Sequence, residues 1–294
     1  MLTETAYAKV NLALHIRRRR EDGYHDLESL FVFVDTGDEL RAEPRADGRL
    51  VLTIDGPFSD GLHDGSDNLV LQAAEKLTLG ICPSTSLANT DRDRAGPRLG
   101  ADIYLSKNLP VASGIGGGSA DAAAALRMLN RLWGCKLSDA QLCTIAEGLG
   151  SDIPACVISQ TLRVEGRGEA LQPCDLPGLS GTPILLVNPG IPLGTAPVFK
   201  GWDRRDRGAL DSSSLGKIIN YGRNDLETPA RALVPQIGLV LDRLAALPGV
   251  MLSRMSGSGA TCFALFESVL ACKTAQAKIA SERPGWWSMS GILR

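Results

Sequence analysis

The first segment of the chain alternates between apolar and polar positions, as a strand with one buried face does. In residues 6–16, AYAKVNLALHI, every even-numbered position is apolar, while the odd-numbered positions include Lys9 and Asn11. Asp22-Gly23 follows as a turn signal, and residues 27–40 have the composition of a returning strand. The pattern predicts an N-terminal β-hairpin.

Three segments have the apolar spacing or the end signals of helices. Residues 68–80 predict a helix that ends at Gly80, and residues 119–133 predict a second one. A third helix is expected to begin at Ser138, because Ser138 and Gln141 have the spacing of a capping box.

Later segments mix both kinds of element. The short apolar runs at residues 183–189 and 262–266 predict strands, whereas residues 229–249 predict a helix with a proline near its start. The polar stretches at residues 83–100 and 201–216 predict loops. Strands and helices do not alternate regularly, which favours the α+β class.

The length of the chain indicates its number of domains, and its net charge weighs against some kinds of partner. The chain has 294 residues, of which 44% are hydrophobic, enough for two domains with a boundary expected near residue 160. A net charge of −2 gives no general basis for binding nucleic acid or a membrane surface. The arginines at residues 17–20 stand beside Glu21 and Asp22, so they predict a solvated hairpin rather than a nucleic-acid site.

Cysteine use and hydropathy indicate the compartment. The seven cysteines form no C-x-x-C pair, and only three histidines are present, which weighs against disulfides and zinc. No apolar run reaches the roughly 18 residues of a spanning helix, and Glu4 and Lys9 interrupt any signal-peptide core. We expect a cytoplasmic protein with no membrane partner.

A glycine cluster carries the first chemical signal. Residues 114–125, GIGGGSADAAAA, place four glycines within five positions, directly before a run of helix formers. A glycine loop that leads into a helix start exposes N–H groups and a partial positive charge, so it is a natural phosphate cradle. Ser119 could cap that helix or offer its hydroxyl to a phosphate or to magnesium. The alternative is a tight turn before a packed helix.

The common phosphate motifs do not fit this cluster. A Walker A motif is absent, since Gly216-Lys217 is followed by Ile218. The dinucleotide pattern G-x-G-x-x-G nearly matches from Gly114, but Ser119 replaces the third glycine. A nicotinamide enzyme is therefore disfavoured but stays open.

Phosphoryl transfer also needs a positive charge and a group that positions or deprotonates the acceptor hydroxyl. Lys9, on the polar face of the first strand, and Asp152, in the turn sequence GLGSDIPAC, are the candidates. A lysine near Asp152 would keep that carboxylate ionised. The plainer interpretations are a solvated strand face for Lys9 and a helix N-cap for Asp152.

Several motifs together resemble the GHMP kinase superfamily. LPVASGIGGGSADAAAAL resembles its phosphate-binding signature, AYAKVNLALHI its first motif, and MSGSGATCFALF its C-terminal glycine loop. The segments DGYHDLESLF, LGSDIP, NPG and NDLE add to the resemblance, which runs from residue 6 to residue 266. It implies a two-domain α+β fold. A ribosomal S5 domain 2-like N-terminal domain would cover residues 1–160, and a ferredoxin-like C-terminal domain residues 161–294.

The resemblance further implies a kinase that uses ATP and Mg²⁺ and a small-molecule acceptor, a sugar alcohol carrying cytidine diphosphate. Lys9 and Asp152 would be catalytic, and the protein ligands of the metal stay open. A monomer or weak homodimer is expected, with no nucleic-acid partner. The residues implied for ATP are Asn68, Lys107, Pro110, Val111, Ala112, Ser113, Gly114, Ile115, Gly116, Gly117, Gly118, Ser119 and Ala120. The residues implied for the acceptor are Asn11, Tyr24, His25, Phe31, Thr195, Phe199, Gly257, Ser258 and Gly259.

Three rival functions remain at this point. One is a kinase of the same superfamily for another small alcohol, such as mevalonate or homoserine. The second is a nucleotide-binding or regulatory protein without catalysis, and the third is a dinucleotide-dependent oxidoreductase. The sequence departs mildly from the family signature at Ile115 and Ala120, where Leu and Ser are expected, and both changes leave the backbone chemistry intact.

Overall fold

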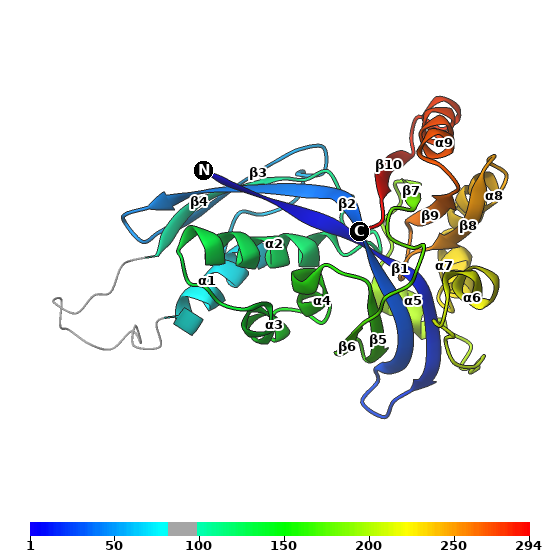
Figure 1. Cartoon of the computed structure of the whole chain (residues 1–294), viewed down its shortest axis with the longest axis horizontal. Coiled ribbons are helices and arrows are strands. Elements are labelled where there is room, and N and C mark those ends of the chain that lie inside the picture. Colours follow the sequence, from blue (N-terminus) through cyan, green and yellow to red (C-terminus); the bar gives the residue numbers. More distant parts are fainter. Residues whose placement is uncertain (82–98) are drawn as a thin grey trace. The chain divides into compact units, whose positions relative to one another are not determined.

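The computed structural model describes residues 1–81 and 99–294, and the chain divides into two compact units (Figure 1). Unit 1 comprises Met1–Ala6, Gly37–Leu109 and Gly118–Ile158, and unit 2 comprises Tyr7–Thr36, Pro110–Gly117 and Ser159–Arg294. Both units are therefore assembled from discontinuous segments. The family domains expected over residues 1–160 and 161–294 stay a prediction, and the loop expected at 83–100 lies outside the described residues except at its end.

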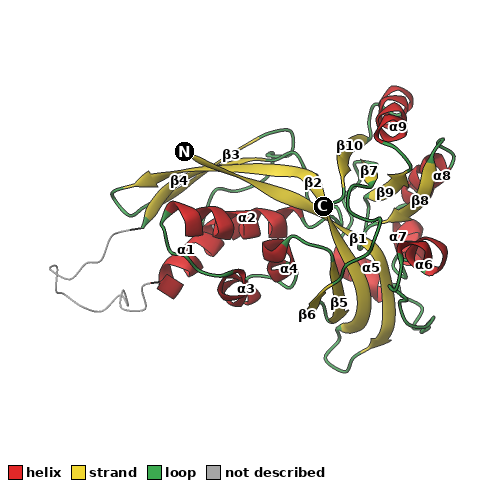
Figure 2. Ribbon diagram, viewed as in Figure 1, coloured by secondary structure: helices red, strands yellow, loops and turns green. Residues whose placement is uncertain are grey.

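Unit 1 combines strands with a group of helices. Strand β4 pairs parallel to β3 and antiparallel to the second half of β2. In Figure 2 the helices of this unit lie along one side of these strands. The elements are β2 (His25–Arg45), β3 (Leu50–Asp55), α1 (Leu69–Ile81), β4 (Gly100–Ser106), α2 (Gly117–Leu132), α3 (Asp139–Glu147) and α4 (Ile153–Ile158).

The predicted helix at residues 68–80 is present as α1, but Gly80 does not end it. The helix continues to Ile81. A Cβ at Gly80 would lie 3.3 Å from Ile145 Cδ1 on α3, which is tight. The absence of a side chain therefore lets α1 approach α3, and this packing offsets the low helix propensity of glycine.

The two helices expected after the glycine cluster are confirmed, with one correction. Ser138 caps α3, and its hydroxyl and the Gln141 side chain form the predicted capping box. Helix α2 begins at Gly117, two residues earlier than expected. Ser119 is consequently part of the first turn and is not the N-cap.

Unit 2 contains the N-terminal hairpin and a four-stranded antiparallel sheet. The first half of β2 pairs antiparallel to β5, which pairs with β6. The second sheet has the order β10-β7-β9-β8 and packs against α8 and α9, as in a ferredoxin-like domain. The elements are β1 (Leu2–Arg19), β5 (Leu162–Gly166), β6 (Ala170–Pro173), β7 (Pro183–Asn188), α5 (Thr195–Lys200), α6 (Leu215–Tyr221), α7 (Glu227–Leu233), α8 (Gln236–Ala245), β8 (Val250–Met255), β9 (Cys262–Phe266), α9 (Val269–Glu282) and β10 (Trp287–Ile292).

Strand β1 departs from the predicted single buried face. Every residue from 8 to 16 is buried, including Lys9, Asn11 and His15. Alternation identified the strand correctly, but it could not show that its polar side is covered as well. Buried polar side chains require partners, and these partners belong to the candidate site described below.

The helix expected over residues 229–249 is two helices in the structure. Helix α7 ends at Leu233 and α8 begins at Gln236, so the break falls at Val234-Pro235. Proline restricts the residue before it to extended conformations, and Val234 has φ −132° and ψ 85°. Both helices still contribute apolar residues, such as Ala230 and Ile237, to the core of unit 2.

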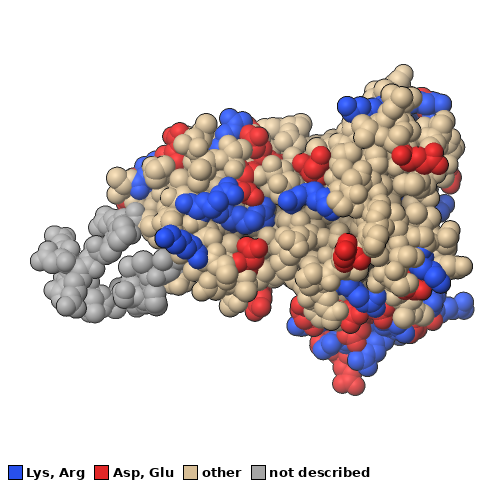
Figure 3. Space-filling model, in the orientation of Figure 1, with Lys and Arg blue, Asp and Glu red and all other residues tan. Residues whose placement is uncertain are grey.

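The arginine run at residues 17–20 lies at the end of β1 and in the turn of the hairpin, as predicted. Arg17 pairs with Glu28 and Asp206, and Arg18 and Arg20 both pair with Asp26. In Figure 3 basic and acidic side chains intermingle at the lower right, where Figure 1 draws this hairpin. Among residues 1–81 and 99–294, no helix is both long and apolar enough to cross a bilayer.

Candidate functional site

Two glycine-rich loops of unit 2 are locked together. One is the segment at residues 110–117, and the other, at residues 256–261, connects β8 to β9. The Ser256 hydroxyl donates to the Gly114 carbonyl at 2.9 Å, and Thr261 N–H donates to the Ser113 carbonyl at 3.1 Å. Gly114 has φ +78°, and a Cβ there would lie 2.5 Å from Ser256 O. Only glycine allows this approach.

Lys9 lies against the same loop. Its N–H donates to the Ile115 carbonyl at 3.1 Å, and its side chain is only 4% exposed. The ammonium Nζ is 4.0 Å from the centre of the Phe31 ring and 3.4 Å from Asn11 Oδ1. Gly116, with φ +65°, leaves room for this lysine, since a Cβ there would lie 3.2 Å from Lys9 Cε. The loop thus encloses a buried cation.

Asn11 ties β1 to the loop at residues 256–261 and to β2. Its N–H donates to Ser256 Oγ at 3.1 Å, and its Nδ2 donates to Ser29 Oγ at 2.9 Å. Asn11 Oδ1 also lies 3.1 Å from where a Cβ of Gly257 would stand, so a side chain at Gly257 would be crowded. The polar face of the first strand therefore positions the loops instead of facing solvent.

Tyr24 and His25 lie in different surroundings. Tyr24 is 60% exposed in the hairpin turn, with the Arg167 guanidinium 5.3 Å from its ring. The His25 ring packs 5.1 Å from Phe199 and edge-on at 5.6 Å from Trp202. Burial, aided by the charge of Arg19, lowers the pKa of His25, so its imidazole is neutral at neutral pH. A neutral imidazole offers one donor and one acceptor to a ligand.

The remaining predicted acceptor residues form a second small cluster. Thr195, the first residue of α5, lies with its hydroxyl oxygen 3.1 Å from that of Ser258. Phe199 is on the same short helix, four residues later. A Cβ at Gly259, which has φ +86°, would lie 2.8 Å from Met255 Sδ. The structure therefore brings Thr195 to the loop at residues 256–261.

Sequence reasoning assigned no role to Asn224, which it named only as part of the NDLE segment. Its Oδ1 accepts from Leu226 N–H, as a cap would. Its Nδ2 also donates to the carbonyls of Met255 and Gly257, both at 2.8 Å. Asn224 therefore fixes the backbone of the loop at residues 256–261 through two hydrogen bonds. An NDLE tetrapeptide gives no sign of this long-range contact.

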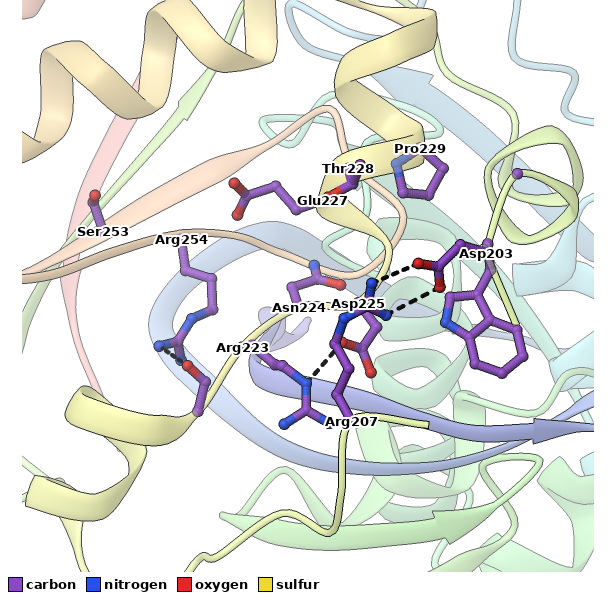
Figure 4. Close-up of a pocket in the computed structure, with 13 residues that line it drawn as sticks. Asp203, Arg207, Arg223, Asn224, Asp225, Glu227, Thr228, Pro229, Ser253 and Arg254 are labelled. Atoms are coloured by element: carbon purple, nitrogen blue, oxygen red, sulfur yellow. Dashed lines mark hydrogen bonds and ion pairs between the residues drawn. The ribbon is translucent and has the colours of Figure 1, made fainter. Parts of the chain in front are cut away.

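Asn224 borders a polar pocket of about 340 Å³ (Figure 4). Arg223 pairs with Asp225 at 2.8 Å, and Asp225 Oδ2 accepts from Ile16 N–H, which fastens this wall to β1. The guanidinium of Arg254 is buried and donates to the Leu12 and Gly222 carbonyls. Burial lowers the pKa of Arg254 to about 10. The contacts of Arg223, Asp225 and Arg254 thus connect the lining of this pocket to β1 and to Gly222.

The other predicted site residues belong to unit 1. Gly118, Ser119 and Ala120 form the first turn of α2. Asn68 precedes α1, where its Oδ1 accepts from Val70 N–H at 2.9 Å. Lys107 follows β4 and is buried, with its ammonium paired to Asp38 and Asp121.

Asp152 lies in the turn directly before α4, and its carbonyl accepts from Cys156 N–H at 3.1 Å. It belongs to unit 1 and Lys9 to unit 2, so their meeting stays a prediction. For a metal, the described part of the chain offers no group of three or more His, Cys, Asp or Glu side chains that could hold an ion.

Two protein-family descriptions match the chain. GHMP kinases N terminal domain matches residues 68–160, and GHMP kinases C terminal matches residues 207–283. The 4-diphosphocytidyl-2-C-methyl-D-erythritol kinase of Rhizorhabdus wittichii is 50% identical over 294 residues, covering 99% of this chain and 94% of that protein. The enzyme of the same name from Novosphingobium aromaticivorans is 49% identical, covering 100% and 93%.

Solved structures give the same picture. A crystal structure of 4-(cytidine 5'-diphospho)-2C-methyl-D-erythritol kinase matches with a TM-score of 0.79 at 32% identity and covers 99% of each chain. Homoserine kinase from Cytophaga hutchinsonii shares the fold, with a TM-score of 0.67 at 18% identity, over 99% of this chain and 95% of its own.

Proposed function

We propose residue roles and a course of reaction for this chain, which belongs to the GHMP kinases and, within them, to the 4-diphosphocytidyl-2-C-methyl-D-erythritol kinases. The enzyme transfers a phosphoryl group from ATP to the 2-hydroxyl of 4-diphosphocytidyl-2-C-methyl-D-erythritol, in the non-mevalonate route to isoprenoid precursors. The proposed transfer is direct and in line, without a phospho-enzyme.

The observation that carries the residue assignment is the pair of locked glycine loops beside the buried Lys9. Residues 110–117 and the first turn of α2 would hold the phosphates of ATP through backbone N–H groups and the helix dipole. Asn68 would lie near the adenine, whereas Lys107, also implied for ATP by the resemblance, has its ammonium buried and paired to Asp38 and Asp121. Such a preformed cradle supplies the electrostatic stabilisation on which phosphoryl transfer depends.

Lys9 and Asp152 are the proposed catalytic residues. Asp152 would orient or accept the proton of the acceptor hydroxyl, and the Lys9 ammonium would stabilise the ionised carboxylate. The burial of Lys9 supports this role, because a buried ammonium interacts with neighbouring charge through a medium of low dielectric constant. Asn11 and Phe31 contact that ammonium and would hold it in place.

Cytidine would be recognised at the hairpin end of the site. Tyr24 presents an exposed ring for stacking on cytosine, and the neutral His25, backed by Phe199, would read the polar edge of the base. Thr195 and the loop at Gly257, Ser258 and Gly259 would contact the acceptor. A hollow of about 510 Å³ that includes Arg19 and Arg204 would attract the diphosphate.

Magnesium would enter bound to the ATP phosphates, because the described residues form no cation cage and Mg²⁺ is commonly held largely by substrate phosphates. A cytoplasmic location, a monomeric or weakly dimeric state and the absence of nucleic-acid and membrane partners belong to the same proposal.

The test is ADP release from Mg-ATP by the purified chain, with 4-diphosphocytidyl-2-C-methyl-D-erythritol, mevalonate or homoserine as acceptor. We expect release only with the cytidine substrate. Asp152→Asn keeps the shape of the side chain but removes the carboxylate, and we expect kcat to fall by about 10²–10⁴ while ATP binding, measured by calorimetry, is kept.

The outcomes separate the rival functions. ADP release with another alcohol would show that the chain is a kinase but that the proposed cytidine site is wrong. ATP binding without turnover on any acceptor would favour a non-catalytic protein, and binding of NAD in place of ATP would favour an oxidoreductase. Near-normal turnover of Asp152→Asn would remove the role assigned to that carboxylate.

A further inference from the structure

A buried ionic cluster in unit 1 lies at the base of the glycine-rich segment. Lys107 Nζ donates to Asp38 Oδ2 at 2.5 Å and to Asp121 Oδ2 at 2.7 Å. All three side chains are almost fully buried, with exposures of 3%, 0% and 6% for Lys107, Asp38 and Asp121. Two acidic side chains therefore share one ammonium in the interior.

The cluster fastens the backbone on both sides of the glycine loop. Asp38 Oδ1 accepts from the N–H groups of Asn108 and Leu109, the last residues before Pro110. Asp121 is on α2, just beyond the turn that the glycines open. The chain leaves the cluster at Leu109 and returns to it at Asp121, so one ammonium links the two ends of the intervening loop.

Stability alone does not account for such a cluster. Burying charges costs free energy that ion pairing offsets only in part, and well-packed apolar residues often stabilise a core as much or more. The position of the cluster gives it another use. Fixing both ends of a loop restricts the conformations that its N–H groups sample before a ligand binds.

The local charge is consistent with a phosphate site. Burial raises the pKa of Asp121, and Asp38 raises it further against the opposing effect of Lys107. The cluster therefore does not add two full negative charges beside the N-terminus of α2, where an anionic ligand would be repelled.

We infer that Asp38, Lys107 and Asp121 form a clamp that pre-organises the phosphate-binding loop, which makes Lys107 a positioning residue and not a ligand of the nucleotide. This rests on the proposal that residues 110–117 hold the ATP phosphates. The backbone of Lys107 points to the same role, since its N–H donates to the Asp55 carbonyl. The clamp acts on the affinity for ATP and leaves the acceptor site unchanged.

The test compares Asp121→Ala with Asp121→Asn in the full chain. Alanine removes the link from α2 to Lys107, and we expect the Kd for Mg-ATP to rise about tenfold or more while the KM for the cytidine acceptor changes less than twofold. Asparagine keeps an oxygen that accepts from Lys107, so it is expected to recover most of the ATP affinity. Calorimetry measures the Kd well below the unfolding temperature.

Glu4→Ala is the matched control, because Glu4 pairs with Arg127 and Arg131 on α2, farther along the helix than Asp121. It is expected to lower Tm with no change in the Kd for ATP.

The clamp would be overturned if Asp121→Ala bound ATP as tightly as the parent chain does. It would also be overturned if the variant lost equal affinity for ATP and for the cytidine acceptor. If Asp121→Ala does not fold, Asp121→Ser, too short to reach Lys107, replaces it. Failure of the parent chain to bind ATP would instead remove the proposed function.

Discussion

Tyr24 and His25 are neighbours in the sequence but lie in different surroundings, and in the proposed site they would divide the recognition of cytidine. The Tyr24 ring is exposed, with the Arg167 guanidinium 5.3 Å away. The His25 ring packs against Phe199 and Trp202, and burial lowers its pKa. Taken alone in the sequence, both residues are better explained as parts of a turn than as ligand contacts. The structure distinguishes them, because a histidine fixed between aromatic rings has an orientation that an exposed turn residue lacks.

We predict that Tyr24→Ala weakens binding of the cytidine substrate by about 10-fold, a loss of roughly 1–1.5 kcal/mol that is typical of one aromatic stack. ATP binding should be unchanged. Tyr24→Phe is the control, because it keeps the ring and removes only the hydroxyl, and its substrate affinity should remain near that of the parent. Calorimetric titration with each ligand measures both effects. Equal losses for ATP and substrate would count against cytosine stacking.

Other single residues mark the limit of sequence reasoning. Lys9 and Asn11 could be singled out because they interrupt an apolar strand, and the structure places both beside the glycine loops. Asp121 and Asn224 could not be identified from the sequence, because each forms its main contacts with residues that are distant along the chain. Asp121 lies inside the recognised motif, but its partner Lys107 was expected only as an ATP-binding residue.

At the scale of elements, each glycine loop depends on a strand or helix that holds it. The segment at residues 110–117 leads into α2, and the loop at residues 256–261 joins β8 to β9. Positive φ values at Gly114, Gly116 and Gly257 show that side chains are disfavoured there for conformational as well as steric reasons.

We predict that Gly116→Ala raises the Kd for ATP at least about 10-fold, because it combines φ +65° with crowding against Lys9. Gly134→Ala is the control. Gly134 has the same φ and lies beyond the other end of α2, where an added Cβ would meet no atom within 4 Å. Both variants should lose about 1 kcal/mol of stability, but only the first should lose ATP affinity. Denaturant unfolding and calorimetry separate the two quantities.

We predict that Asn224→Ala destabilises the chain by about 1–3 kcal/mol, since it leaves the buried carbonyls of Met255 and Gly257 without their donor. Because that loop is the proposed acceptor contact, the KM for the acceptor should rise more than that for ATP. Asn224→Asp keeps the shape of the side chain but replaces the donor amide by a carboxylate. It should therefore restore neither the stability nor the acceptor KM that Asn224→Ala loses. An unchanged acceptor KM in a folded Asn224→Ala would show that the loop holds its conformation without this residue.

For the whole molecule, the sequence predicted the class of fold and the elements with the clearest periodicity or end signals, because such signals are local. The capping box of Ser138 and the strands at residues 183–189 and 262–266 are examples. It failed where tertiary packing decides, as at Gly80, which continues a helix against Ile145. The discontinuous make-up of the two units also had no local signal, since β1 and β2 contribute residues to both.

The buried Asp121 gives the whole molecule a predicted pH dependence. Its pKa is raised from 3.8 to about 8, mainly by burial, so between these values the folded chain binds a proton that the unfolded chain has released. The resulting contribution to stability is complete below pH 3.8 and is lost as the pH rises toward 8. Since one pKa unit is worth about 1.4 kcal/mol, the free energy of unfolding should fall by at least about 1 kcal/mol between pH 5.5 and 8.5 from this group.

Urea unfolding at several pH values measures this slope, and Asp121→Asn isolates the contribution of the carboxyl. The variant has no titrating group at this position, so its stability should change less steeply with pH and should exceed that of the parent most clearly near pH 8.5. Asp26→Asn serves as the opposite control. Arg18 and Arg20 lower the pKa of Asp26, so its contribution is present at neutral pH and disappears only in acid. Identical slopes for the parent and Asp121→Asn would mean that Asp121 is ionised throughout this range and that Lys107 outweighs its burial.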